Sequence, residues 1–226
     1  MSAGTQISMN PNLLTSRNYQ LDGGGQFQRF LTPCPGVADA FVTSQANAQC
    51  SVDFSGQSTI RVNPSTVKAY RFLPYREGNN GAACTYTELD ANAQLVLTGP
   101  LSGCFIYVAK LGARTILFHC NANGIANPAL NAQAKIAKID AVINQQFNGA
   151  ATVARLVFDT NVAGLPALAG GARYTGYSGY LSFVAGCKPR AGISLKSRGW
   201  TGSLGADDWT FYVYGYNANG RILRQM

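Results

Sequence analysis

The stretch TGPLSGCFIYVAKLGARTILFH occupies residues 98–119 and contains two apolar, β-prone runs. These runs, residues 104–109 and 114–119, flank a four-residue segment with a glycine, which has the length and composition of a hairpin loop. We therefore predict an antiparallel pair of strands. If the strands pair symmetrically about the loop, Cys104 lies directly opposite His119, with the two Cβ atoms about 4.5–5.5 Å apart on one face of the sheet.

This pairing would bring a nucleophile and a base together. A free thiol has a pKa of about 8.5, and an adjacent imidazole lowers that pKa and later protonates the leaving group. His119 is the only histidine of the chain, so any thiol–imidazole chemistry must use it. The pattern predicts acyl transfer through a thioester. The alternative is that Cys104 is a small buried apolar residue and His119 a satisfied core or surface residue.

The residues before Cys104 would complete such a site. Ser102 and Gly103 belong to a turn, and Gly103 lets a substrate carbonyl approach the backbone closely. The N–H groups around Gly103 and Cys104 are then the expected oxyanion hole. Thr98, six residues before Cys104, is expected to end the preceding strand, where its hydroxyl or a nearby carbonyl holds His119 in the useful tautomer.

The rest of the chain predicts many strands and one good helix. Glycine, proline and asparagine clusters separate the short β-prone runs. The predicted strands are residues 59–62, 67–73, 94–97, 104–109, 114–119, 152–158, 179–185, 210–214 and 221–224. The helix is expected over residues 131–147, where Ile136, Ile139 and Ile143 form an apolar stripe that is read as core packing. This content predicts an α+β sandwich with mixed sheets.

The chain is predicted to form one domain with an N-terminal extension. Residues 1–30 are polar, include three consecutive glycines and are expected to form a loosely attached arm. Residues 31–226 are expected to form the single catalytic domain. The first residues lack a basic region followed by an apolar stretch, and no apolar run approaches the roughly 18–20 residues that cross a bilayer. We therefore expect no membrane span, and either a cytosolic location or export without a Sec-type signal peptide.

The composition favours acidic partners and β-structure. Only 12 % of residues are charged, 46 % are apolar, and the net charge is +8. A basic surface attracts an acidic protein face, nucleic acid or anionic lipid. The densest basic stretch consists of Lys188, Arg190, Lys196 and Arg198. It is interpreted as a solvated loop, or alternatively as a patch that docks an acidic partner, and nucleic acid is not required.

The cysteines do not form a metal motif. The six cysteines, residues 34, 50, 84, 104, 120 and 187, lack CxxC or other metal-ligand spacing, so neither a zinc site nor a cofactor is expected. If Cys104 is the nucleophile, at most two disulfides form among the other five. The simplest expectation is six reduced and mostly buried thiols in a reducing compartment.

The motif Leu101–Ser102–Gly103–Cys104 resembles the LSGC motif of the toxin glutamine deamidases typified by cytotoxic necrotizing factor and Burkholderia lethal factor. In that family the motif cysteine is the nucleophile, and a histidine follows at the end of the next strand. His119 stands at that place, although more residues separate it from Cys104 than separate the two residues in the lethal-factor branch. Thr98 matches a threonine that completes the site in that branch. The stretch LPYREG at residues 73–78 is similar to a segment before the active site.

The resemblance covers residues 73–119 and implies a fold and a reaction. The implied fold is a sandwich of two mixed β-sheets flanked by helices and long loops. The implied reaction is hydrolysis of a glutamine side-chain amide in a host protein, either a small GTPase or a translation-initiation RNA helicase. A toxin of this kind acts in the host cytosol. Tyr75 and Tyr107 are candidates for the substrate rim, with core packing as the alternative.

Three other functions stay open at this point. A transglutaminase would use the same thioester with an amine in place of water. A cysteine protease would use the same pair on a backbone amide. A non-enzymatic β-sandwich binding module would use asparagine, tyrosine and glycine loops, and the aromatic segment at residues 200–219 is its best support.

Overall fold

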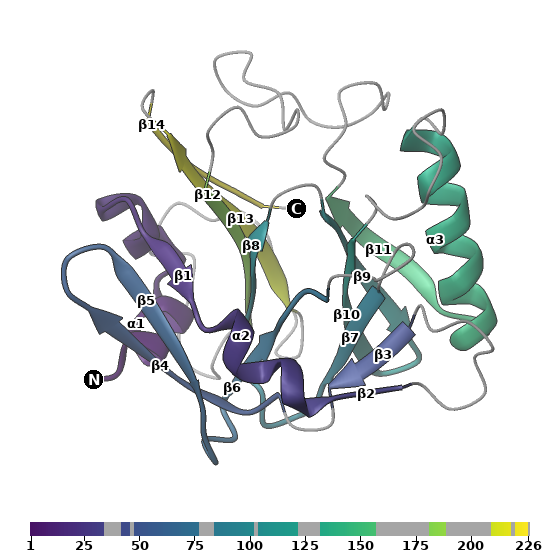
Figure 1. Cartoon of the computed structure of the whole chain (residues 1–226), viewed down its shortest axis with the longest axis horizontal. Coiled ribbons are helices and arrows are strands. Elements are labelled where there is room, and N and C mark those ends of the chain that lie inside the picture. The colour runs from purple at the N-terminus through teal and green to yellow at the C-terminus, as the bar shows by residue number, and fades with distance from the viewer. Residues whose placement is uncertain are drawn as a thin grey trace.

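The hairpin of residues 104–121 lies within the larger of two central sheets in the computed structural model (Figure 1). The structure describes residues 1–33, 42–45, 48–76, 84–101, 104–121, 132–156, 181–188, 209–217 and 220–225. Strands β9 (Cys104–Leu111) and β10 (Arg114–Asn121) form the hairpin, with Leu111 opposite Arg114. The turn is therefore two residues long, and its Gly112 has φ +58°, a left-handed value that glycine adopts without steric cost.

The six-stranded sheet surrounds this hairpin. Its order is β11-β9-β10-β7-β3-β2, and every pairing is antiparallel except the parallel pair β3–β7. The additional strands are β11 (Ala151–Leu156), β7 (Cys84–Leu89), β3 (Val42–Gln45) and β2 (Leu31–Pro33).

A five-stranded sheet packs against it, in the order β14-β13-β12-β8-β6, with β6 and β8 parallel. Its strands are β14 (Gly220–Gln225), β13 (Thr210–Asn217), β12 (Leu181–Cys187), β8 (Leu95–Leu101) and β6 (Tyr70–Leu73). Two residues of β8 lie between Thr98 and Leu101, whereas only one residue of β12 lies between their partners, Val184 and Ser182. The Gly-Pro pair before Cys104 is thus a β-bulge within β8, and Thr98 does not end the strand as expected.

The N-terminal segment forms a third, smaller sheet and several short helices. Strands β1 (Gln20–Asp22), β5 (Thr59–Pro64) and β4 (Cys50–Ser55) pair in that order. The helices here are α1 (Ala3–Met9), η1 (Pro11–Ser16), α2 (Gly24–Phe27) and η2 (Gln28–Phe30). Helix α3 (Ala132–Gln146) lies on the other side of the molecule, against the six-stranded sheet (Figure 1).

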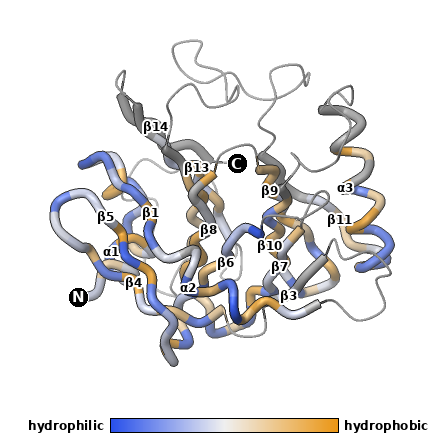
Figure 2. Tube along the Cα trace, in the orientation of Figure 1, coloured by the Kyte–Doolittle hydropathy of each residue, from blue (hydrophilic) through white to orange (hydrophobic). Residues whose placement is uncertain are grey.

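Three apolar cores separate these layers. The first joins the N-terminal helices and the small sheet to the five-stranded sheet, the second joins α3 to the six-stranded sheet, and the third lies between the two large sheets. Figure 2 shows apolar segments along β8 and β9 in the middle of the molecule. Both large sheets are covered on both faces, which explains why the central strands β8 and β9 are almost continuously apolar.

The α+β sandwich of two mixed sheets is confirmed, with a third small sheet in addition. The expectation of a loosely attached N-terminal arm is wrong. Ile7, Leu14 and Phe27 are fully buried in the first core, and β1 pairs with β5. The local sequence does not predict this packing, because each of the three buried side chains belongs to a different short element within a polar stretch.

Candidate active site

Thr98 and His119 meet in the interior between the two large sheets. Thr98 lies on β8 of the five-stranded sheet, and His119 lies on β10 of the six-stranded sheet. The Oγ1 atom of Thr98 is 2.6 Å from Nδ1 of His119, and both side chains are fully buried. The predicted contact between the two residues is therefore present, as a hydrogen bond across the sandwich.

The hydrogen-bond partners of Thr98 determine the tautomer of His119. Thr98 Oγ1 also lies 2.6 Å from the carbonyl oxygen of Leu73, which can only accept. The single hydroxyl proton of Thr98 therefore goes to Leu73, and Thr98 accepts a hydrogen bond from Nδ1–H of His119. The proton of the neutral ring is then on Nδ1, and Nε2 carries the lone pair.

The second ring nitrogen is buried and available as a base. Nε2 of His119 has no hydrogen-bond partner among the described residues. Burial lowers the pKa of His119 from 6.5 to about 3, because an imidazolium ion is poorly solvated in this interior. The imidazole is thus neutral at pH 7, in the form that accepts a proton.

Cys104 lies on the same face of the hairpin as His119, but not directly opposite to it. His119 pairs with Ile106, and Cys104 pairs with Asn121, so the predicted direct pairing is wrong by two residues. The error comes from the turn, which is two residues rather than four. A shift by an even number preserves the face, and diagonal neighbours of this kind are about 7–8 Å apart along the sheet.

The thiol of Cys104 lies in the core between the large sheets. The side chain is 5 % exposed, belongs to the same apolar cluster as Leu73 and Ile106, and is not part of a disulfide. Ser102 and Gly103, the predicted turn and oxyanion residues, lie outside the described residues. Their role stays a prediction.

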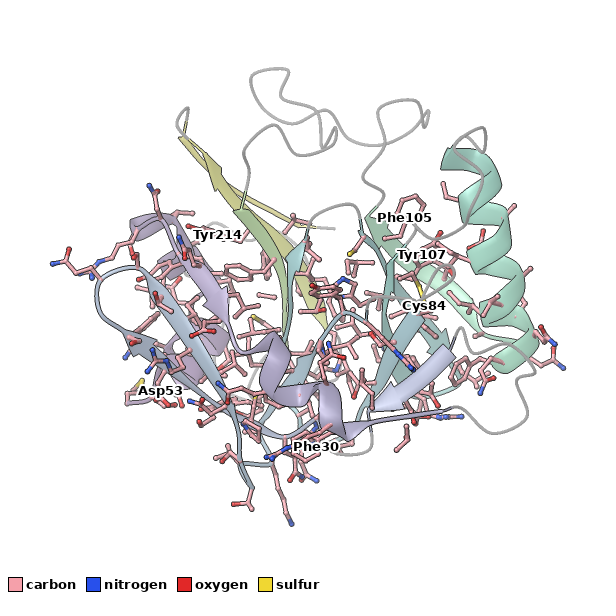
Figure 3. The ribbon with its side chains drawn as sticks, in the orientation of Figure 1. Phe30, Asp53, Cys84, Phe105, Tyr107 and Tyr214 are labelled. Carbon is pink, nitrogen blue, oxygen red and sulfur yellow. A yellow bond between two sulfur atoms is a disulfide. The ribbon has the colours of Figure 1, made fainter. Side chains whose placement is uncertain are left out.

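The two predicted rim tyrosines lie on opposite sides of the six-stranded sheet. The Tyr75 ring is half-buried and lies 6.0 Å from the His119 ring, at an interplanar angle of 37°. Tyr107 is fully buried in the core beneath α3, where Figure 3 shows it beside Phe105. The rim prediction for Tyr107 is therefore wrong, because alternate residues of β9 face opposite sides and Cys104 faces the other one.

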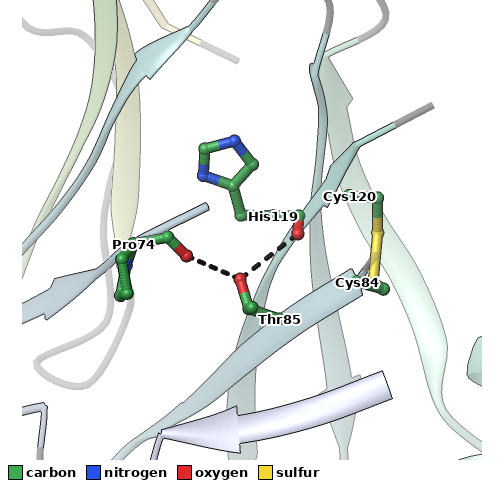
Figure 4. Close-up of a disulfide and its surroundings, with 5 residues drawn as sticks. All are labelled: Pro74, Cys84, Thr85, His119 and Cys120. Atoms are coloured by element: carbon green, nitrogen blue, oxygen red, sulfur yellow. Dashed lines mark hydrogen bonds between the residues drawn. A yellow bond between two sulfur atoms is a disulfide. The ribbon is translucent and has the colours of Figure 1, made fainter. Parts of the chain in front are cut away.

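One functional candidate escaped sequence reasoning. Thr85, on β7, pairs directly with His119 and is fully buried, with its Oγ1 2.7 Å from the carbonyl oxygen of Pro74 and 3.3 Å from that of His119 (Figure 4). Pro74 belongs to the LPYREG stretch at residues 73–78. Nothing in the sequence links Thr85 to that segment, because the hydrogen bond depends on how the strands are ordered in the sheet.

The cysteines are not all reduced. Cys84 and Cys120 form a disulfide between β7 and β10, on the face that packs against α3 (Figure 4). The expectation of six reduced thiols is therefore wrong. Cys50 and Cys187 are buried thiols in the first core, and burial raises the pKa of Cys187 to about 12. Cys34 lies outside the described residues.

Other features of the described chain do not contribute to this site. A hollow of about 530 Å³, lined by residues of α2, η2 and β5, contains none of the candidate residues. Within the described ranges, no three acidic, cysteine or histidine side chains gather as a metal site.

No helix of the described residues is long and apolar enough to cross a membrane. Of the basic stretch, only Lys188 lies within the described residues, and it is half-buried.

Comparison with known proteins adds no family to these observations: no protein-family model matches the chain, and no curated protein is significantly similar to it.

Proposed function

We propose that this chain is a protein-glutamine deamidase with Cys104 as nucleophile, His119 as base and acid, and Thr98 as the residue that orients His119. The observation that carries the proposal is the hydrogen bond from His119 Nδ1 to Thr98. It leaves Nε2 without a proton, on the same face of the hairpin as Cys104. A triad uses this tautomer, because its outer nitrogen receives the proton of the nucleophile.

The reaction balances without a cofactor. The sulfur of Cys104 attacks the carboxamide carbon of a glutamine side chain while Nε2 of His119 takes the thiol proton. His119 returns that proton to the departing nitrogen, which leaves as ammonia, and a thioester forms. Water then attacks the thioester, His119 takes a proton from the water and returns it to the sulfur. The products are glutamate, ammonia and the regenerated enzyme.

The depressed pKa of His119 defines the resting state in this mechanism. Because the imidazole is neutral at pH 7, its proton is acquired only as the thiol reacts. The imidazolium formed in this way is poorly solvated in the core and readily returns its proton to the leaving nitrogen. Burial therefore opposes the first proton transfer, from the thiol to Nε2, and favours the second, from the imidazolium to the leaving nitrogen.

The substrate class follows from the LSGC resemblance. We propose that the target is a glutamine of a host protein, in the class of small GTPases or translation-initiation RNA helicases, and that the chain acts as a toxin in the host cytosol. The net charge of +8 supports an acidic surface on that partner. The glutamate that forms carries a new negative charge, which disables the surface around it.

The test incubates the purified chain with a host-cell lysate and identifies glutamines that become glutamate by mass spectrometry, together with released ammonia. The comparison is Cys104→Ala, with Cys50→Ala as the matched control because Cys50 is a buried thiol outside the site. We expect deamidation with the wild type and with Cys50→Ala, and none with Cys104→Ala. Addition of a primary amine distinguishes a transglutaminase, which incorporates the amine, and peptide cleavage identifies a protease.

Alkylation of the thiol separates an enzyme from a binding module. We expect iodoacetamide to label Cys104 faster than Cys50 in the native protein, and His119→Ala to slow the labelling of Cys104 alone. Equal slow labelling of both thiols, unchanged by His119→Ala and without any deamidation, would return Cys104 and His119 to a purely packing role.

A further inference from the structure

The hydroxyl of Thr85 connects the segment after β6 to the strand that carries His119. Thr85 Oγ1 contacts two carbonyl oxygens, at 2.7 Å for Pro74 and 3.3 Å for His119. Both carbonyls only accept, and the hydroxyl has one proton, so the shorter contact to Pro74 is the principal hydrogen bond. Figure 4 shows Thr85 between these two oxygens.

Two consecutive carbonyls are thus held by threonines from different sheets. Leu73 accepts from Thr98 on β8 at 2.6 Å, and Pro74 accepts from Thr85 on β7 at 2.7 Å. Pro74 has no N–H group with which to anchor this segment itself. Leu73 ends β6, where it pairs with Thr98, and the Thr85 hydroxyl holds the carbonyl that directly follows this pair. Loss of that hydrogen bond is expected to let the peptide unit between Leu73 and Pro74 rotate.

The Leu73 carbonyl in turn decides where the proton of His119 lies. While it accepts from Thr98, the Thr98 oxygen can only accept from Nδ1–H. If the carbonyl moves away, the hydroxyl proton of Thr98 is free to point at Nδ1, and the imidazole proton moves to Nε2. An Nε2–H tautomer cannot take the proton of a thiol.

We propose that Thr85 is a positioning residue that keeps the proton of His119 on Nδ1, through the Pro74 and Leu73 carbonyls and Thr98. Its effect on reaction rate rests on the proposed function of Cys104 and His119, whereas its effect on the tautomer does not. Thr85 touches neither the thiol nor the expected substrate, so its contribution is to orientation.

The neighbouring disulfide determines which part moves when this hydrogen bond is lost. Thr85 follows Cys84, His119 precedes Cys120, and the two half-cystines are bonded to each other beside the Thr85–His119 pair. The two strands are therefore covalently held together at this point. Loss of the Thr85 hydroxyl is expected to displace the Leu73–Pro74 segment rather than the strands.

The test reads the tautomer directly by nitrogen NMR of the full chain labelled with ¹⁵N-histidine. His119 is the only histidine, so the spectrum contains one pair of ring nitrogens. We expect the wild type to carry its proton on Nδ1, Thr85→Val to shift the population toward the Nε2–H tautomer, and Thr85→Ser to restore the wild-type pattern. Thr87→Val is the matched control, because Thr87 is buried on the same face of β7 and its hydroxyl makes no hydrogen bond to the described residues.

The outcomes separate this inference from the proposed function. A wild-type protein with its proton on Nε2 overturns the inference even if the valine variant does not fold. A folded Thr85→Val protein with the wild-type tautomer overturns it as well. For the rate, we expect Thr85→Val to lower deamidation on the order of tenfold to a hundredfold, and Thr87→Val to leave it unchanged. If the wild type releases no ammonia but the tautomer responds as expected, the proposed function fails and the positioning role of Thr85 stands.

Discussion

The two ring nitrogens of His119 have different surroundings, and this asymmetry determines which of them can accept a proton. Nδ1 donates to Thr98, whose own proton is committed to Leu73. Nε2 has no partner among the described residues. A buried polar atom without a hydrogen bond costs about 1–3 kcal/mol, so a packing role alone gives little reason to retain it. A proton acceptor used in catalysis gives such a reason.

Removal of the Thr98 hydroxyl tests that asymmetry. Thr98→Val keeps the shape of the side chain but leaves the Leu73 carbonyl and His119 Nδ1 without their shared partner. We expect the free energy of unfolding to fall by about 1–3 kcal/mol per orphaned group, and the deamidation rate to fall roughly 10²–10⁴-fold. Urea unfolding and ammonia release measure the two effects.

Thr115→Val is the control for this substitution. Thr115 is buried on β10, on the same face as His119, and its hydroxyl makes no hydrogen bond to other described residues. We expect this variant to retain the wild-type rate. A Thr98→Val protein as active as Thr115→Val would show that His119 does not need Thr98 for its orientation.

At the scale of elements, the N-terminal helices act as the cover of the five-stranded sheet. Leu14, in η1, is fully buried in the first core, whereas the preceding residue, Leu13, is only partly buried. We expect Leu14→Ala to lower the free energy of unfolding by about 2–5 kcal/mol and Leu13→Ala to lower it by much less. Denaturant unfolding of both variants measures the difference. Equal small losses would support the loosely attached arm that the sequence suggested.

The disulfide between β7 and β10 links two strands of the six-stranded sheet covalently. It joins residues 36 positions apart, which on a chain-entropy model stabilises the fold by about 4 kcal/mol. We expect the double variant Cys84→Ala/Cys120→Ala to lose about 2–4 kcal/mol in urea unfolding. A matching loss when the wild type is unfolded with a thiol reductant would identify the bond as its source. No loss in either experiment would show that the link does not constrain the unfolded chain.

At the scale of the whole molecule, burial of both large sheets explains the low charge content. Each sheet is covered on both faces, so its strands have few solvent-facing positions for charged residues. The 12 % of charged residues in the chain is consistent with this architecture. The site lies in the most enclosed layer, between the two sheets, and its titration is therefore coupled to the stability of the entire fold.

That coupling predicts an acid-sensitive fold. The pKa of His119 falls from 6.5 in the unfolded chain to about 3 in the folded state, so between these values the unfolded state binds a proton that the folded state does not. Stability is complete above pH 6.5 and declines as the pH falls toward 3, by at most about 1.4 kcal/mol per pH unit from this group. Urea unfolding between pH 7 and pH 4 should show a steeper decline for the wild type than for His119→Gln. Parallel curves would mean that His119 is not neutral in the folded protein.

Local patterns in the sequence were sufficient for most of the elements. The apolar runs of β9 and β10 predict strands because both strands are buried on both faces, and the stripe of Ile136, Ile139 and Ile143 predicts α3. Five strands, β1, β2, β3, β4 and β7, were not predicted. Strands β1, β2 and β3 are only three or four residues long, and β4 and β7 contain several polar residues. The partners of β1 and β7 are also distant in the chain, so no local pattern marks these two strands.

The sequence by itself predicted the hairpin that carries Cys104 and His119, because two apolar runs flank a glycine-containing turn. It placed the two residues on one face only for a symmetric register or one shifted by an even number of residues, because the side-chain period of a strand is two. Only the tertiary structure decided which atoms approach His119. Thr98 comes from the opposite sheet, and Leu73, Pro74 and Thr85 are brought together by the order of strands in both sheets. These contacts are non-local. Each threonine hydroxyl has a single proton, and the carbonyl that accepts it determines which atoms donate and which accept in these hydrogen bonds. The assignment of donors and acceptors therefore depends on the packing of the two sheets, which no local stretch of sequence encodes.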